Sequence, residues 1–248
     1  MMVNVTRRTA NTYQAAMQAC PFARVHEFML PLQLANLQPK ETLVDFPSGG
    51  GYLRPFIAKI NAEIGYVPVE NVAGYAEYNP EIIGGTWTNL PFTDGQVDVV
   101  FTLAAIHHML DCRAEFYQEC FRVLSNQGRF IIADVLAGSA PARFLDEFVG
   151  SYSSQGHRAR FIDLKTDSAE IEVAGLFKVS DAYSQRFAWE FKDVDSLVTY
   201  CRNLFRIDLA SDRQIEEGLR HYLGIHQVDH GFDLQWELAF IRANKLPA

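Results

Sequence analysis

Three short stretches of the sequence carry residue types that could bind a ligand or move a proton. The stretch VDFPSGGGYL, residues 44–53, places Asp45 and three consecutive glycines directly after an apolar run. Glycine backbones approach ligands closely, and such a turn at the end of a strand is typical of nucleotide-binding α/β proteins. A strand-to-helix turn that binds nothing has the same composition. The turn is therefore a candidate site that needs support from the rest of the chain.

The second stretch is GYAEYNPEI, residues 74–82, which places Glu77 at the end of a predicted second strand. A carboxylate at this point can accept hydrogen bonds from both hydroxyls of a ribose. The neighbouring Tyr78 offers a ring that could lie against an adenine. A solvated surface glutamate is the alternative interpretation.

The third stretch contains the adjacent histidines His107 and His108. They could provide a base, a metal pair or hydrogen-bonded packing residues. Adjacent helical residues point about 100° apart, and no further metal ligands cluster nearby in the sequence, so the spacing predicts no metal site. The cysteines form no CxxC pair, which favours four reduced thiols: Cys20, Cys112, Cys120 and Cys201.

Apolar patterns predict the elements that position these stretches. We expect buried strands at 41–46, 70–78, 96–106 and 128–136, with helices at 52–64 and 113–124 between them. An N-terminal helical segment, 11–37, is divided by Pro21 and Pro31. In the second half we expect helices at 140–155, 159–174, 193–206 and 211–223, and strands at 177–191 and 233–243. The alternation predicts a doubly wound, mostly parallel α/β sheet with a helical cap.

Composition narrows the classes of partner. The chain has 248 residues, a net charge of −8 and a pI near 5.4, so nucleic acid is not expected as a partner. No window approaches the roughly 18 apolar residues of a membrane span, and the N-terminal residues are polar rather than signal-like. We therefore expect a cytoplasmic protein; its oligomeric state is not indicated.

Taken together, the stretches resemble the class I S-adenosylmethionine-dependent methyltransferases. The matching residues read VDFPSGGG, AEYNPEI, NLPFTDGQVDVV, IHHML and FRVLSNQGRFIIADV, in that order, and cover residues 41–136. They look closest to the small-molecule branch, which includes ubiquinone/menaquinone-type C-methyltransferases and biotin-pathway malonyl-carrier O-methyltransferases.

The resemblance implies a seven-stranded sheet and a single domain. Its parts would be an N-terminal helical cap (1–38), a cofactor-binding core (39–138), a second-half core with cap insertions (139–232) and a closing strand (233–248). It also implies S-adenosylmethionine as cofactor, S-adenosylhomocysteine as product, and a small-molecule or carrier-bound acceptor.

Site residues are implied position by position. Ser48, Gly49 and Gly51 would line the methionine part of the cofactor, with Asp45 supporting the turn and the amino group. Glu77 would hold the ribose. The other implied cofactor contacts are Tyr78 and Trp87 at the adenine, Thr102 and Leu103 at the methionine moiety, and Tyr13 and Arg24 from the N-terminal helix. His108, then His107, would be the base or would orient the acceptor, and acceptor-pocket linings are expected among Tyr152, His157, Tyr183, Trp189 and Tyr222.

Two departures from the family pattern support an alternative. Pro47 replaces the first glycine of the turn, and Thr86 stands where relatives carry an acidic residue. The alternative is a non-catalytic partner or sensor that binds S-adenosylmethionine or S-adenosylhomocysteine. A nicotinamide oxidoreductase is disfavoured because Arg54 occupies the third glycine position of a G-x-G-x-x-G loop.

Overall fold

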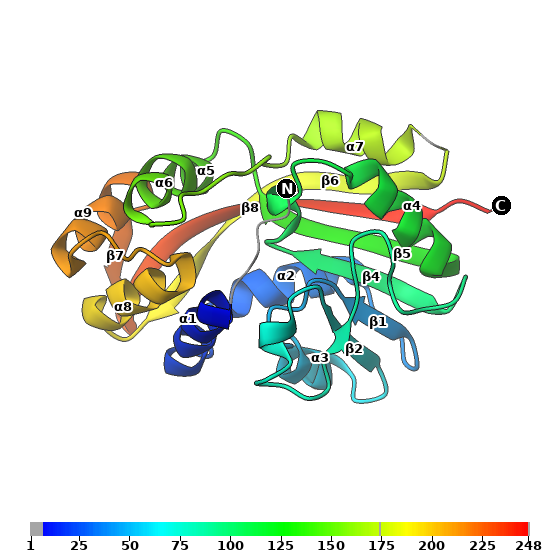
Figure 1. Cartoon of the computed structure of the whole chain (residues 1–248), viewed down its shortest axis with the longest axis horizontal. Coiled ribbons are helices and arrows are strands. Elements are labelled where there is room, and N and C mark those ends of the chain that lie inside the picture. Colours follow the sequence, from blue (N-terminus) through cyan, green and yellow to red (C-terminus); the bar gives the residue numbers. More distant parts are fainter. Residues whose placement is uncertain (1–6, 174, 248) are drawn as a thin grey trace.

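A mixed β-sheet forms the centre of the molecule (Figure 1). The computed structural model describes residues 7–173 and 175–247. The sheet runs in the order β3-β2-β1-β4-β5-β8-β6, and β7 pairs with β8 beside this path. The strands are β1 (Thr42–Asp45), β2 (Gly65–Glu70), β3 (Ile83–Gly84), β4 (Val97–Leu103), β5 (Leu124–Val135), β6 (Phe177–Phe191), β7 (Ile225–Val228) and β8 (Gly231–Lys245). Strands β1 to β5 pair in parallel and β8 is antiparallel to its neighbours, so the predicted doubly wound, mostly parallel sheet is confirmed.

Helices cover both faces of this sheet because alternate strand residues are apolar on each side. Val99 and Phe101 of β4 face the cluster that contains residues of α2 and α3, whereas Val100 faces the cluster with α4 and α7. These helices are α2 (Val25–Ala35), α3 (Arg54–Ile60), α4 (Arg113–Val123) and α7 (Leu164–Glu172). The carboxyl ends of β1, β2 and β4 therefore meet at one edge, between two packed layers.

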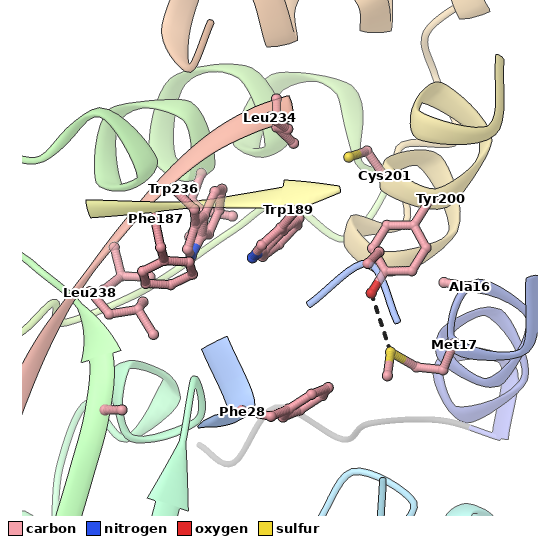
Figure 2. Packing of buried hydrophobic residues seen from close by; sticks show 14 of the residues in the cluster. Ala16, Met17, Phe28, Phe187, Trp189, Tyr200, Cys201, Leu234, Trp236 and Leu238 are labelled. Carbon is pink, nitrogen blue, oxygen red and sulfur yellow. Dashed lines mark hydrogen bonds between the residues drawn. The ribbon is translucent and has the colours of Figure 1, made fainter. Parts of the chain in front are cut away.

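A helical cap surrounds the far end of the long β6–β8 ribbon (Figure 1). It contains β7, α5 (Ala140–Arg143), a π-helix (Phe144–Val149), α6 (Gly150–Tyr152), α8 (Val194–Phe205) and α9 (Asp212–Tyr222). The N-terminal helix α1 (Arg7–Ala19) packs on α8. In the core next to α1 and α8, Trp189 stacks on Trp236 with ring centroids 4.4 Å apart. The Tyr200 hydroxyl donates a hydrogen bond to the Met17 sulfur (Figure 2).

Capping side chains set where the second-half helices begin. Asp193 accepts from Ser196 N at 2.7 Å at the start of α8. Ser211 and Gln214 form a reciprocal capping box at the start of α9. Each cap satisfies backbone N–H groups that the first helical turn leaves unpaired.

The predicted second strand, 70–78, is wrong. The strand is β2, which ends at Glu70, and the chain continues into a 3-10 turn at Ala73–Tyr75. Pro68 lies inside β2, and a proline normally argues against a strand. The N-terminal segment also differs, because Pro31 lies inside α2 and only Pro21 falls between the two helices.

Candidate functional site

The glycine turn after β1 depends on three residues in the left-handed region. Gly49, Gly50 and Gly51 have φ values of +56°, +113° and +80°. Residues with a Cβ rarely adopt such angles, so all three positions favour glycine. Pro47 precedes them, and its fixed negative φ does not conflict with any left-handed position. The proline therefore leaves the demanding part of the turn intact.

Hydrogen bonds fix this turn to its neighbouring strands. Phe46 N donates to Phe101 O of β4 at 2.9 Å, and Ser48 N donates to Val69 O of β2 at 2.9 Å. The backbone of the turn is thus positioned by the sheet.

Glu70 ends β2 and reaches the glycine turn. It is 5% exposed, and its Oε2 accepts from Gly49 N at 2.8 Å. Burial raises the pKa of its carboxyl to about 7. Glu77, the acidic residue singled out in the sequence, lies instead on an exposed turn beyond the 3-10 segment. The structure therefore places Glu70, not Glu77, at the end of the second strand.

A signal for Glu70 is present in the sequence. It follows Gly51 by 19 residues. An acidic residue about 20 residues after a glycine loop is the spacing of a ribose-binding carboxylate. Sequence reasoning missed it because the strand before it contains a proline.

Asp45 forms a second buried carboxyl beside the turn. It is 2% exposed, and Tyr66 donates its hydroxyl hydrogen to Oδ2 at 2.7 Å. Burial, reinforced by the nearby charge of Glu70, raises the pKa of Asp45 to about 8, against the opposing hydrogen bond from Tyr66. Two buried carboxyls at one edge favour the binding of a positively charged group.

Tyr13 and Arg24 are brought to this edge by the N-terminal segment. An ideal Cβ on Gly49 would lie 3.4 Å from the Tyr13 hydroxyl. Arg24 Nη1 donates to that hydroxyl at 3.0 Å. The Arg24 guanidinium is itself buried and makes a two-point ion pair with Glu27, at 2.9 and 2.6 Å. Tyr13 is therefore the residue of this pair that reaches the turn.

Tyr78 and Trp87, the two aromatic residues expected at the adenine, differ in burial. Tyr78 is 41% exposed and hydrogen-bonds Asn11 of α1. Trp87 is buried, and its ring packs edge-on against Phe46 and Phe116, each with ring centroids 4.9 Å away. Trp87 thus serves as core behind the turn.

Two buried hydroxyls near the strand ends lack a partner in the described chain. Thr102 Oγ1 of β4 and Ser48 Oγ of the turn make no hydrogen bond there. Thr102 is 1% exposed, whereas the adjacent Leu103 is partly buried. Unpaired buried hydroxyls are unfavourable, so each fits a site that a ligand or water completes.

The histidine pair lies in a one-turn 3-10 helix, Ile106–His108, just past β4. His107 is buried and its Nδ1 lies 2.6 Å from Asp134 Oδ1 of β5. Its backbone N–H donates to the other Asp134 oxygen at 3.0 Å. Burial opposes ionisation of Asp134, but His107 and these hydrogen bonds hold the pKa of Asp134 below its usual value. A third histidine, His157, lies beside both rings.

The residues expected to line an acceptor pocket do not come together. Trp189 is core, Tyr183 lies 37% exposed on β6, and His157 joins the histidine pair. Tyr152 and Tyr222 line a shallow cap groove of about 520 Å³. Of the candidate linings, Trp189 is therefore a core residue, whereas Tyr152 and Tyr222 share one groove. Aromatic composition alone does not distinguish a core residue from a pocket lining.

Comparison with known proteins agrees with this architecture. A structure of an S-adenosylmethionine-dependent methyltransferase from Thermotoga maritima superposes with a TM-score of 0.64, at 16% identity, over 98% of this chain and 99% of its own. Geranyl diphosphate C-methyltransferase from Streptomyces coelicolor superposes with a TM-score of 0.54, at 12% identity, over 90% of this chain and 79% of its own. At these identities the likeness shows a shared fold.

Sequence comparison finds similar methyltransferases. An uncharacterised methyltransferase of Synechocystis is 29% identical over 117 residues, which are 45% of this chain and 54% of that relative. The chain thus spans about half the length of this curated relative. The family described as a methyltransferase domain matches residues 45–132. Together these matches support a class I S-adenosylmethionine-dependent methyltransferase.

The residues matched by this domain begin at Asp45 and end within β5. They include the glycine turn, Glu70 and the histidine pair. Tyr13, Asp134 and the whole cap lie outside them. Within the described residues, the chain has no helix with the length and apolar character needed to cross a bilayer.

Proposed function

We propose that the chain transfers the methyl group of S-adenosylmethionine to a small-molecule or carrier-bound acceptor by in-line displacement. One observation carries this proposal. The left-handed glycine turn ends the first strand beside two buried carboxyls, Asp45 and Glu70. The match of residues 45–132 to a methyltransferase domain supports the same chemistry.

The residues present fit this cofactor. Glu70, at the end of β2, would hold the ribose hydroxyls. Asp45 would act on the positively charged methionine end, with Tyr13 and the unpaired Ser48 hydroxyl alongside. Tyr78 would flank the adenine, and Thr102, Leu103, Gly49 and Gly51 would line the remaining surface. Bound here, the cofactor would supply a methyl group activated by its sulfonium.

The protein's own contribution is position and proton handling. The sheet fixes the position of the turn. Asp134 holds the His107 ring through Nδ1, so Nε2 is not used in this contact. A fixed imidazole can orient an acceptor, and it can take the acceptor's proton while its free nitrogen binds no cation. We therefore keep His107 and His108 as the residues that act on the acceptor.

Calorimetry tests the cofactor assignment. We expect S-adenosylmethionine and S-adenosylhomocysteine to bind with dissociation constants below the millimolar range, and NADH not to bind. Absence of binding by both sulfur compounds would refute the proposed function. Incubation with methyl-labelled cofactor and a metabolite extract then separates an enzyme from a sensor, because a sensor binds without labelling any acceptor.

The raised pKa values predict that cofactor affinity increases with pH. In the free protein, Glu70 and Asp45 hold protons until the pH passes about 7 and about 8. A cationic ligand favours their ionised forms, so binding releases protons and strengthens as pH rises through this range. The increase can reach about tenfold per pH unit for each proton released. Asp45→Asn should flatten the profile, whereas equal affinity at pH 6 and pH 8.5 in the wild-type chain would contradict this linkage.

A further inference from the structure

Three histidines from two distant segments meet at the edge of the sheet. His107 and His108 follow β4, and His157 lies in the loop between α6 and α7. One ring nitrogen of each lies within 4.8 Å of the other two. The ring centroids are 4.0 Å apart for His107 and His108, 5.8 Å for His107 and His157, and 5.6 Å for His108 and His157. The imidazoles therefore lie near enough for a side-chain rotation to bring them around one ion.

His107 is held as metal-binding histidines usually are. Its Nδ1 contacts Asp134, which leaves Nε2 for a ligand. A carboxylate behind a histidine fixes ring orientation and increases the basicity of the ligating nitrogen. The backbone of the same turn is anchored as well, since Arg160 N donates to His107 O at 2.8 Å and Arg113 Nη2 donates to Ile106 O at 3.3 Å. This ligand position is thus rigid.

His157 has a similar arrangement. Its side chain is 9% exposed, and Asp146 Oδ1 lies 3.5 Å from its Nδ1. That nitrogen is buried and makes no hydrogen bond within the described chain. His108 is the exposed member of the group. Two fixed rings and one adjustable ring suit a site that closes when an ion enters.

We propose that His107, His108 and His157 bind a divalent transition-metal cation of the Zn²⁺ type. Neutral imidazole is a preferred ligand of Zn²⁺, whereas Mg²⁺ and Ca²⁺ prefer oxygen ligands. A Zn–N distance of about 2.0–2.1 Å requires nitrogens nearer to one another than 4.8 Å, so the exposed His108 ring must turn inward. Three protein ligands leave the fourth tetrahedral position open, as in catalytic zinc sites.

The open position suggests what kind of acceptor the site takes. This step rests on the proposed methyl transfer. The histidines lie just beyond β4, at the edge that also carries the glycine turn. A hydroxyl or thiol bound to the cation would lose its proton to solvent more readily, because the cation stabilises the anion. The site therefore favours an acceptor that is methylated on oxygen or sulfur.

Zinc binding tests the site directly, without any cofactor. The full chain is stripped with a chelator and titrated with Zn²⁺ against a chromophoric competitor. We expect one equivalent to bind in the wild-type chain. His157→Ala should weaken binding about 100-fold or more, and Asp134→Asn, which keeps all three histidines, about 10- to 100-fold. Thermal melts of each variant confirm folding.

The matched control is His230→Ala. His230 is an exposed histidine 3.9 Å from Glu190 and 3.6 Å from Asp233, so it is a plausible adventitious zinc contact. This variant should bind zinc as the wild type does. The proposal is overturned if the wild type takes up no stoichiometric zinc, if His157→Ala binds as tightly as wild type, or if the loss follows His230. Failure of S-adenosylmethionine to bind in calorimetry would refute the methyl transfer and leave the zinc result standing.

Discussion

Replacing Glu70 with alanine is expected to weaken S-adenosylmethionine binding about 100-fold. Glu70 stands at the end of β2, where its carboxylate would accept hydrogen bonds from the ribose. A hydrogen bond to a charged group contributes about 1.5–3 kcal/mol, and 2.7 kcal/mol corresponds to about 100-fold in the dissociation constant. Isothermal titration calorimetry at pH 8 measures the loss directly, at a pH where the carboxyl is largely ionised in the wild type.

Two further variants make this experiment decisive. Glu70 also accepts from Gly49 N, so Glu70→Ala could disturb the turn itself. Glu70→Gln keeps an acceptor for Gly49 and removes only the charge, and we expect it to lose affinity as well. Glu77→Ala tests the residue singled out by the sequence and should bind normally. The reverse pattern, loss in Glu77→Ala and none in Glu70→Ala, would return the ribose contact to Glu77.

Replacing Gly231 with alanine is expected to destabilise the fold by about 3–5 kcal/mol. Gly231 begins β8 with φ of +141°, and an added Cβ would lie 2.1 Å from Phe191 O and 3.0 Å from Lys192 Cα. Both contacts are backbone, which cannot swing aside as a side chain can. Backbone strain of about 1–3 kcal/mol and overpacking of a similar size add at this position. Urea denaturation monitored by circular dichroism gives the free energy of unfolding.

Gly138→Ala is the matched control for this prediction. Gly138 also has a positive φ, +73°, but an added Cβ meets no heavy atom within 4 Å. Gly138→Ala should lower the free energy of unfolding only by the cost of a left-handed backbone conformation, about 1–2 kcal/mol. If the two variants lose equal stability, the clash at Gly231 does not explain its cost.

The sequence predicted the sheet best where apolar residues run without interruption. The predicted strand at 177–191 coincides with β6, and 41–46 contains β1. The apolar pattern did not predict β2, because this strand contains Pro68. Its backbone nevertheless pairs in parallel with β1. For this reason the sequence pattern indicated Glu77 as the carboxylate at the end of the second strand, whereas the strand ends at Glu70.

Contacts between distant segments could not be predicted in the same way. His157 lies about 50 residues from His107, in a loop with no periodicity to place it. The position of Tyr13 next to Gly49 likewise depends on how α1 packs against the cap helix α8. The resemblance to methyltransferases did place Tyr13 and Arg24 near the site, which the residue pattern alone did not.

The β6–β8 ribbon determines how this molecule can open. Its pairing continues from Phe177 opposite Lys245 in the core to Phe191 opposite Phe232 in the cap, and its one irregularity, at Val179/Asp181, lies at the core end. A hinge between core and cap would have to break several ladder hydrogen bonds at once, each contributing about 1 kcal/mol net. The paired strands β6 and β8 therefore form a rigid connection that keeps the core and the cap at a fixed distance. Slow hydrogen exchange should extend along both strands without a gap.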